Sequence, residues 1–429
     1  MPMLDRTLPP AFRPITGFDL IRPRLVTFGN GVKLFVFREG TQDLVRIEWV
    51  FNNVFERESQ GLLNMAVNEL MLEGTSAYSS AQIAELVDFH GAFLVPQFGY
   101  DQSTLTLFSL NKHLGNLLPL VKDILTDATF PEAELETYVR NNKQKLQVSL
   151  KKNSFVARRL FNKRVFGPTR YGYVPGMADY DRLSDEALLA QFLKQCTADN
   201  CTLVVSGNVT DDVIASLERL FGGQWRDETV APAADNPPVF VPPHALLMVD
   251  ERKEALQSAI RIGYQSIQRR HPDFPGLQVL NTVLGGYFGS RLMVNIREDK
   301  GYTYNISSAL VSLKHAAFFT LASEVGVQVT KATLAEIESE IQRLRDEPVD
   351  EAELALVRNY MMGAMLGSLE NIFSHADLFK NVYFSGLDLD YYDYYTQVVN
   401  TITPDTLLRL ANTYLDYDKM VKVVVGKLV

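Results

Sequence analysis

The sequence has few cysteines, no excess of basic residues and no long apolar run. Only Cys196 and Cys201 occur in 429 residues, which excludes a disulfide framework and fits a reducing compartment. The formal net charge is −9, so the chain lacks the basic surface on which non-specific nucleic-acid binding depends. No apolar stretch is long enough to span a bilayer. We therefore expect neither nucleic acid nor a membrane as a partner.

The start of the chain lacks the basic segment and apolar core of a secretory signal peptide. We expect a cytoplasmic protein if Met1 is the true start, and a periplasmic one if a leader was removed before it. Histidine is also scarce, because no histidine precedes His90 and none of the six forms a pair at metal-ligand spacing. A Gly-x-x-x-x-Gly-Lys loop, a Gly-x-Ser-x-Gly elbow and a Cys/His pair are absent too. An autonomous enzyme with another site is thus the weakest of the functional hypotheses.

Two segments of the chain, one in each half, repeat each other. Phe130–Leu135 reads Phe-Pro-Glu-Ala-Glu-Leu, and Val349–Leu354 reads Val-Asp-Glu-Ala-Glu-Leu. A long helical stretch follows each copy, and alternating strands such as Arg46–Phe51 and Ala259–Tyr264 precede it. We predict an α+β fold of two homologous domains, each a mixed sheet with helices packed on one face.

A proline-rich segment separates the two halves. Residues 228–243 contain five prolines, which stiffen extended backbone and remove hydrogen-bond donors. We predict an N-terminal domain over residues 1–227, a linker over 228–243 and a C-terminal domain over 244–429. Two similar domains joined in this way are expected to face each other as a clamshell.

The apolar segment Gly61–Thr75 resembles the zinc helix of the insulinase/pitrilysin metallopeptidases, which include the mitochondrial processing peptidase. That family carries His-x-x-Glu-His, an inverted zincin motif. The five motif positions here hold, in order, Met65, Ala66, Val67, Asn68 and Glu69. Zinc requires converging imidazole, thiolate or carboxylate ligands, which Met65, Asn68 and a lone Glu69 do not supply. We predict a degenerate zinc site and no metal in this chain.

The resemblance also implies a third zinc ligand, a glutamate on a helix further along the chain. The corresponding region, Val139–Lys145, contains amides and bases and no carboxylate. The resemblance thus implies that all three ligand positions and the catalytic base are replaced, and that this chain does not cut peptides alone.

A second motif lies in the C-terminal half, over Leu284–Ser308. It contains Ser-Arg-Leu, then Arg297-Glu298, and then Gly301-Tyr-Thr-Tyr304. We predict that Gly301 ends a short helix and that Tyr304 lies on the strand after it, so that the side chains of Arg297 and Tyr304 converge. From the residues alone, Arg297 could equally pair with a neighbouring acid or with its helix C-terminus, and Tyr304 could be a core residue.

The insulinase family's C-terminal domain has the same order of residues. The resemblance implies that Arg297 binds a substrate carbonyl and that Tyr304 donates to the oxyanion that forms at the scissile bond. A preorganised donor directed at developing negative charge stabilises the transition state. The predicted substrate is a peptide or an unfolded polypeptide.

Two functional hypotheses follow from this combination. In the first, the chain is the non-catalytic, substrate-binding subunit of a heterodimeric zinc metallopeptidase, and a homologous subunit with the zinc motif holds the metal. In the second, it is a non-enzymatic peptide-binding or assembly protein of the same fold, with a homodimer as the simpler variant. The resemblance supplies a precedent, because the core subunits of the respiratory cytochrome bc1 complex have this fold and are non-catalytic. Copurification with a zinc-motif homologue would favour the first hypothesis.

Overall fold

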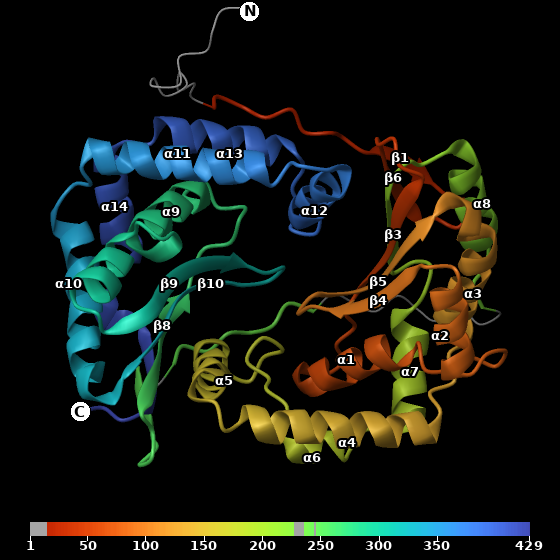
Figure 1. Cartoon of the computed structure of the whole chain (residues 1–429), viewed down its shortest axis with the longest axis horizontal. Coiled ribbons are helices and arrows are strands. Elements are labelled where there is room, and N and C mark those ends of the chain that lie inside the picture. Colours follow the sequence, from red (N-terminus) through yellow and green to blue (C-terminus); the bar gives the residue numbers. More distant parts are fainter. Residues whose placement is uncertain (1–14, 227–235, 244–245) are drawn as a thin grey trace, which may run out of the picture.

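The computed structural model describes residues 15–226, 236–243 and 246–429, which form two sheets with their helices (Figure 1). The first sheet has the strand order β1-β2-β6-β3-β5-β4, and the second has the order β7-β11-β8-β10-β9. Both are mixed, because β2 pairs with β6 and β7 with β11 in parallel, whereas the other pairs are antiparallel. The predicted α+β class is confirmed.

The first half contains both long strands and long helices. Its strands are β1 Arg24–Thr27, β2 Lys33–Arg38, β3 Leu44–Asn52, β4 Phe93–Phe98, β5 Gln102–Leu110 and β6 Cys201–Gly207. Its helices are α1 Gly61–Leu70, α2 Ser80–Phe89, α3 Leu114–Asp127, α4 Glu132–Ser149, α5 Asn153–Phe166, α6 Met177–Tyr180, α7 Asp185–Gln195 and α8 Asp211–Phe221.

The second half repeats this plan. Its strands are β7 Leu247–Glu251, β8 Gln257–Gln265, β9 Thr303–Ser312, β10 Ala317–Gly326 and β11 Val421–Gly426. Its α-helices are α9 Phe274–Asn281, α10 Thr330–Asp346, α11 Glu351–Gly367, α12 Ile372–Tyr383, α13 Asp390–Thr401 and α14 Pro404–Tyr414. Helices α11, α12 and α14 begin after α4, α5 and α7, respectively, at one constant spacing, the same that separates Phe130 from Val349. The repeat found in the sequence therefore extends to the positions of whole helices.

One helix from each half packs against the sheet of the other half. Helix α5 lies against β8 and β11, where Phe161 and Phe166 join a buried cluster that includes Val421 and Val423. Helix α12 lies against β2 and β6, and the Phe379 ring is centred 4.6 Å from that of Phe35. Each sheet thus carries its own helices on one face, as predicted, and a helix from the other half on the second face (Figure 1).

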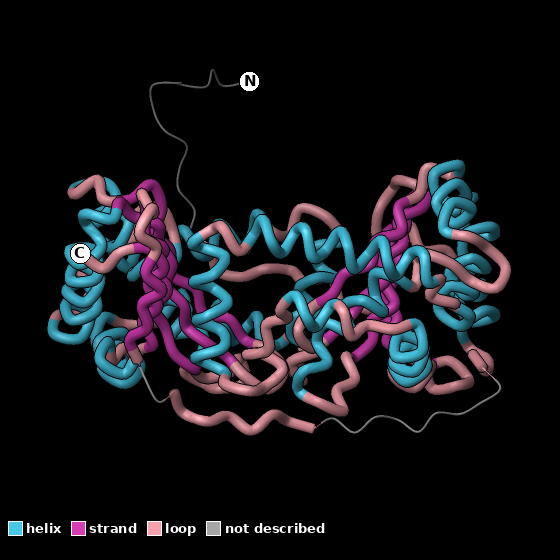
Figure 2. Tube along the Cα trace, turned by 90° about the horizontal axis from the view of Figure 1, so that it is seen from below, coloured by secondary structure: helices cyan, strands magenta, loops and turns pink. Residues whose placement is uncertain are grey.

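The described part of the predicted linker, residues 236–243, runs along one side of the molecule (Figure 2). Residues 236–243 contain no helix or strand, and Figure 2 shows them as a loop. Phe240 anchors this loop, because its ring stacks on Tyr171 of the first half with ring centres 6.2 Å apart. Residues 228–235 of the predicted linker, and 244–245 beyond it, lie outside the described residues. The domain limits at 227 and 244 stay a prediction.

No helix in the described parts of the chain is both long enough and apolar enough to cross a membrane.

Candidate functional site

Helix α1 carries the three degenerate zinc-motif positions on one face, because they are three and four residues apart, but they are buried to different extents. Asn68 is buried, Met65 is half-buried, and Glu69 is exposed. The Asn68 Nδ2 atom has no hydrogen-bond partner. Two of these side chains are a thioether and an amide, whereas zinc requires imidazole, thiolate or carboxylate ligands.

Glu69 faces helix α4, which contains the region where the third ligand was sought. Its nearest ionisable neighbours there are Tyr138 and Lys145. Partial burial of the carboxyl raises the pKa of Glu69, and the charge of Lys145 and the hydroxyl of Tyr138 partly offset that effect. A lysine in this position repels a metal cation. Across the described residues, no group of three or more His, Cys, Asp or Glu side chains is placed to hold a metal ion.

The second motif folds into a π-helical turn followed by an edge strand. The turn, η4, spans Met293–Asp299 and carries Arg297 in its last turn. Gly301 then adopts a φ of +65°, which lets the chain reverse into β9, and the Tyr302 amide donates to the Ile296 carbonyl at 2.9 Å. The predicted reversal at Gly301 is therefore present. The π-helical winding was not predicted, although such turns occur often at functional sites.

Arg297 and Tyr304 lie beside each other on the surface. The Arg297 guanidinium carbon is 5.4 Å from the centre of the Tyr304 ring and 4.5 Å from that of Phe288. Tyr304 is 87% exposed, so the alternative that it is a core residue is wrong. Arg297 forms no hydrogen bond or ion pair with any residue that the structure describes, which leaves its donors open to a ligand.

Another arginine of the motif has a structural role. Arg291 donates from Nε and Nη2 to the two carboxylate oxygens of Glu353, at 2.9 and 2.8 Å. Glu353 belongs to the repeated Glu-Ala-Glu-Leu segment at the start of α11. This two-bond pair ties the Arg/Tyr motif to the helix that the repeat identified.

A β-bulge directs the Tyr304 side chain outward. Thr303 lies opposite Val325 and Ile306 opposite Ser323, so that Tyr304 and Asn305 face the single residue Glu324. The extra residue interrupts the alternation of the strand, and bulges commonly re-aim a side chain in this way. The spacing of apolar residues in this strand gave no sign of the bulge.

Two hydroxyl groups hold the bulge in place. The Thr303 hydroxyl donates to the Glu324 carbonyl at 2.7 Å and accepts from the Asn305 amide at 3.2 Å. The Ser323 hydroxyl lies 3.1 Å from Thr303 Oγ1 and 3.0 Å from the Asn305 carbonyl. Thr303 and Ser323 therefore hold the backbone that carries Tyr304, and the sequence alone did not single them out.

Tyr304 also lines a pocket of about 330 Å³ between α5 and the second sheet. Ser154 and Ala157 of α5 form one wall, and residues of β8, β9 and β10 form the rest, among them Arg261 and Glu324. Helix α5, which packs on the sheet of the other half, thus contributes residues of the first half of the chain to the Arg297/Tyr304 site.

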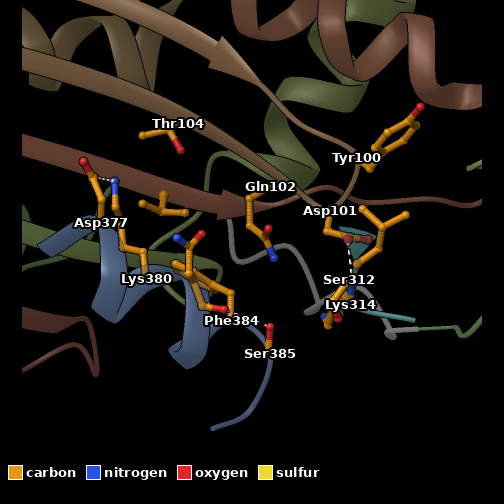
Figure 3. A pocket seen from close by; sticks show the side chains of 13 residues that line it. Tyr100, Asp101, Gln102, Thr104, Ser312, Lys314, Asp377, Lys380, Phe384 and Ser385 are labelled. Carbon is orange, nitrogen blue, oxygen red and sulfur yellow. Dashed lines mark hydrogen bonds and ion pairs between the residues drawn. The ribbon is translucent and has the colours of Figure 1, made fainter. Parts of the chain in front are cut away.

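A second pocket, of about 400 Å³, lies where the tips of two hairpins meet (Figure 3). Asp101 accepts the Lys314 backbone N–H at 2.8 Å on one side, and Lys380 pairs with Asp377 at 2.9 Å on the other. Because these charges are already paired within the protein, this pocket is a weaker candidate for ligand binding than the pocket beside Tyr304.

The chain is similar in sequence to several known proteins. A family profile described as the peptidase M16 inactive domain matches residues 182–361. The chain is 24% identical over 350 residues to the uncharacterized zinc protease YmxG of Bacillus subtilis. The aligned region covers 80% of this chain and 84% of that protein. It is 21% identical over 253 residues to the probable inactive metalloprotease YmfF of the same organism, covering 55% and 56% of the two chains.

The fold is similar to that of a solved bacterial protein. The crystal structure of a peptidase M16 inactive domain from Pseudomonas fluorescens superposes with a TM-score of 0.85 at 19% identity, over 95% of this chain and 98% of that one. The resemblance that the sequence motifs indicated is confirmed. Residues 182–361 match the peptidase M16 inactive-domain family, and the chain as a whole shares the fold of a solved peptidase M16 inactive domain.

Proposed function

We propose that this chain is the substrate-binding, non-catalytic subunit of a heterodimeric zinc metallopeptidase. The observation that carries the proposal is the pairing of Arg297 with Tyr304 on an exposed surface, where neither serves the internal structure. The degenerate α1 helix supports it, since the chemistry that this chain lacks has to come from a second subunit.

The geometry suits recognition of a polarised peptide carbonyl. The rings of Phe288 and Tyr304 hold the Arg297 guanidinium by cation–π contacts, which limits its rotamers without using its N–H donors. Arg297 then donates to a substrate carbonyl, and the Tyr304 hydroxyl donates to the oxygen that gains negative charge. A zinc ion held by the partner would activate the attacking water.

The sheet edge beside this pair offers a place for an extended peptide. Strand β9 pairs only with β10, so that its other edge is open in the described sheet. A peptide that adds to this edge gains main-chain hydrogen bonds, and its side chains alternate between the two faces. The substrate in this proposal is therefore an unfolded segment and not a folded surface.

The test uses the chain co-expressed with a zinc-motif homologue and verified as a heterodimer by size-exclusion chromatography. Tyr304→Phe is expected to lower kcat for peptide cleavage by about a hundredfold with little change in KM, because one oxyanion donor is lost. Tyr302→Phe, two residues away and half-buried, is the matched control. Unchanged kcat in a verified heterodimer would contradict the proposal. A stable homodimer that binds peptide, but forms no complex with a zinc-motif homologue, would favour the alternative of a peptide-binding or assembly protein.

A further inference from the structure

Helices α5 and α12 each pack on the sheet of the other half of the chain, but the charged residues in the two contacts differ. At the first sheet, α12 brings Asp377 and Lys380 against Arg46 and Glu48 of β3. Arg46 lies 2.9 Å from Asp377 and 3.2 Å from Glu48, and Lys380 pairs with both acids. Two cations and two anions therefore balance each other in this interface.

The equivalent positions at the second sheet hold no such balance. The constant spacing between the two halves places Arg158 of α5 where α12 has Asp377, and Phe161 where it has Lys380. Strands β3 and β8 both have nine residues and pair in the same order, which places Arg261 where β3 has Glu48. Both the helix and the strand at the second sheet thus have a basic residue where their counterparts at the first sheet have an acidic one.

Arg158 and Arg261 are close enough to affect each other. Partial burial lowers the pKa of Arg261, the charge of Arg158 lowers it further, and Glu324 acts in the opposite direction. Neither arginine forms an ion pair or hydrogen bond with a residue that the structure describes; Arg158 only lies over the Phe155 ring, at 5.6 Å. With Glu324 counted, these three groups still carry one excess positive charge.

Arg261 and Tyr304 line the same pocket of about 330 Å³. An unpaired guanidinium in a partly dehydrated pocket attracts a carboxylate more strongly than one on an open surface, because the surrounding dielectric is lower. A ligand that enters this pocket and contacts Tyr304 thus shares it with a cation that Glu324 only partly offsets.

We propose that Arg261, supported by Arg158, binds a carboxylate of the peptide whose backbone contacts Tyr304. The substrate class is then a peptide with an acidic side chain, or a free C-terminal carboxylate, near the bound carbonyl. This inference rests on the proposed substrate-binding function and specifies the class of peptide that is bound.

The test measures peptide binding to the full-length chain without a partner, by fluorescence anisotropy at low ionic strength. Three fluorescein-labelled peptides share one neutral scaffold: an amidated peptide, the same peptide with one internal Gln replaced by Glu, and the neutral peptide with a free C-terminus. The wild-type chain is expected to bind one or both of the acidic peptides about tenfold more tightly than the neutral one. The Glu peptide and the free acid distinguish the two sources of the carboxylate.

Arg261→Gln is expected to remove the preference while the Kd of the neutral peptide stays the same. Arg158→Gln, on the exposed side of α5, is expected to reduce the preference in part. Arg219→Gln is the matched control, because Arg219 is an exposed arginine on α8, outside the lining of this pocket. Equal thermal unfolding midpoints confirm that the variants are folded.

A preference for acidic peptides that survives in Arg261→Gln would overturn this inference, and so would a wild-type chain that binds all three peptides equally or none of them. The result is separable from the proposed function. Binding here requires no zinc and no partner, whereas the Tyr304→Phe test measures cleavage by the heterodimer. A carboxylate preference that depends on Arg261, together with unchanged cleavage in Tyr304→Phe, would retain the subsite and reject the role of Tyr304.

Discussion

Asp101 connects the two halves of the chain through Tyr171. The Tyr171 hydroxyl donates to Asp101 Oδ1 at 2.6 Å and accepts the His315 backbone N–H at 3.2 Å. Asp101 Oδ2 accepts the backbone N–H of Lys314, which lies in the other half of the chain, at 2.8 Å. Burial raises the pKa of Tyr171, and the neighbouring Asp101 carboxylate raises it further, so the hydroxyl remains a donor at any physiological pH.

Replacing Asp101 with Ala is expected to loosen the junction of the two hairpins. The Lys314 amide then loses a charged acceptor, which costs about 1–3 kcal/mol. Hydrogen exchange in a peptide spanning residues 312–316 should become faster by about tenfold or more, while the cores of the two sheets keep their protection. Asp88→Ala, at an exposed position on α2, is the control. Unchanged exchange at Lys314 would show that the link does not hold the halves together.

Lys380 and Glu48 form the central ion pair of the buried network under α12. The Glu48 side chain is only 3% exposed, so Lys380→Met leaves a buried carboxylate with Arg46 as its remaining cation. We expect the free energy of unfolding to fall by about 2–4 kcal/mol in urea titrations. The double variant Glu48→Gln/Lys380→Met should be more stable than the sum of the single losses predicts, and strict additivity would contradict a coupled pair.

Lys122 gives stability a specific dependence on pH. Its Nζ atom lies 4.7 Å from the Trp225 ring and has no hydrogen-bond partner among the described residues. Burial, followed by the charge of Arg226, lowers the pKa of Lys122 from 10.5 to about 8. Between these values the unfolded chain binds the proton and the folded chain does not, so stability rises with pH in this window. The group therefore destabilises the fold below pH 8, and the penalty disappears as the pH approaches 10.5.

Lys122→Met is accordingly expected to stabilise the protein at pH 7. We expect a gain of about 1 kcal/mol, because Lys122 is only partly buried and because the loss of its ring contacts offsets part of the benefit. Urea unfolding at pH 7 and pH 10 should show that the difference from wild type shrinks at the higher pH. The exposed Lys112→Met controls for the change in net charge. A gain that is the same at both pH values would exclude the titration of Lys122 as its cause.

Thr303→Val tests the positioning role of the bulge. Valine has nearly the same shape as threonine but no hydroxyl, so the bonds to Glu324 and Asn305 are lost and Tyr304 is no longer held in its outward position. In the proposed heterodimer we expect kcat to fall by roughly tenfold with KM nearly unchanged, and Thr303→Ser to restore most of the lost kcat. The exposed Ser307→Ala on the same strand is the control. Equal kcat values for Thr303→Val and wild type would remove this role.

Several features of the protein were determined by its sequence. The repeat of Phe130–Leu135 at Val349–Leu354 identified helices α4 and α11 as counterparts, because helix boundaries depend on local patterns of apolar residues and caps that each copy retains. The residues at 65–69 and the Arg297-to-Tyr304 segment carried the resemblance to a peptidase family. Those signals are local in the chain, so they were readable without a structure.

The remaining features depend on contacts between segments far apart in the chain. The apolar residues of α5 and α12 indicate that each helix is buried, but a buried face does not specify which sheet covers it. The bulge at Tyr304 depends on hydrogen-bond register between two strands, which side-chain spacing does not encode. The pairing of charges under α12, and its absence under α5, follows from the exchange of these helices. Only the tertiary structure could place Arg261 and Tyr304 in one pocket, because α5 closes that pocket from the other half of the chain.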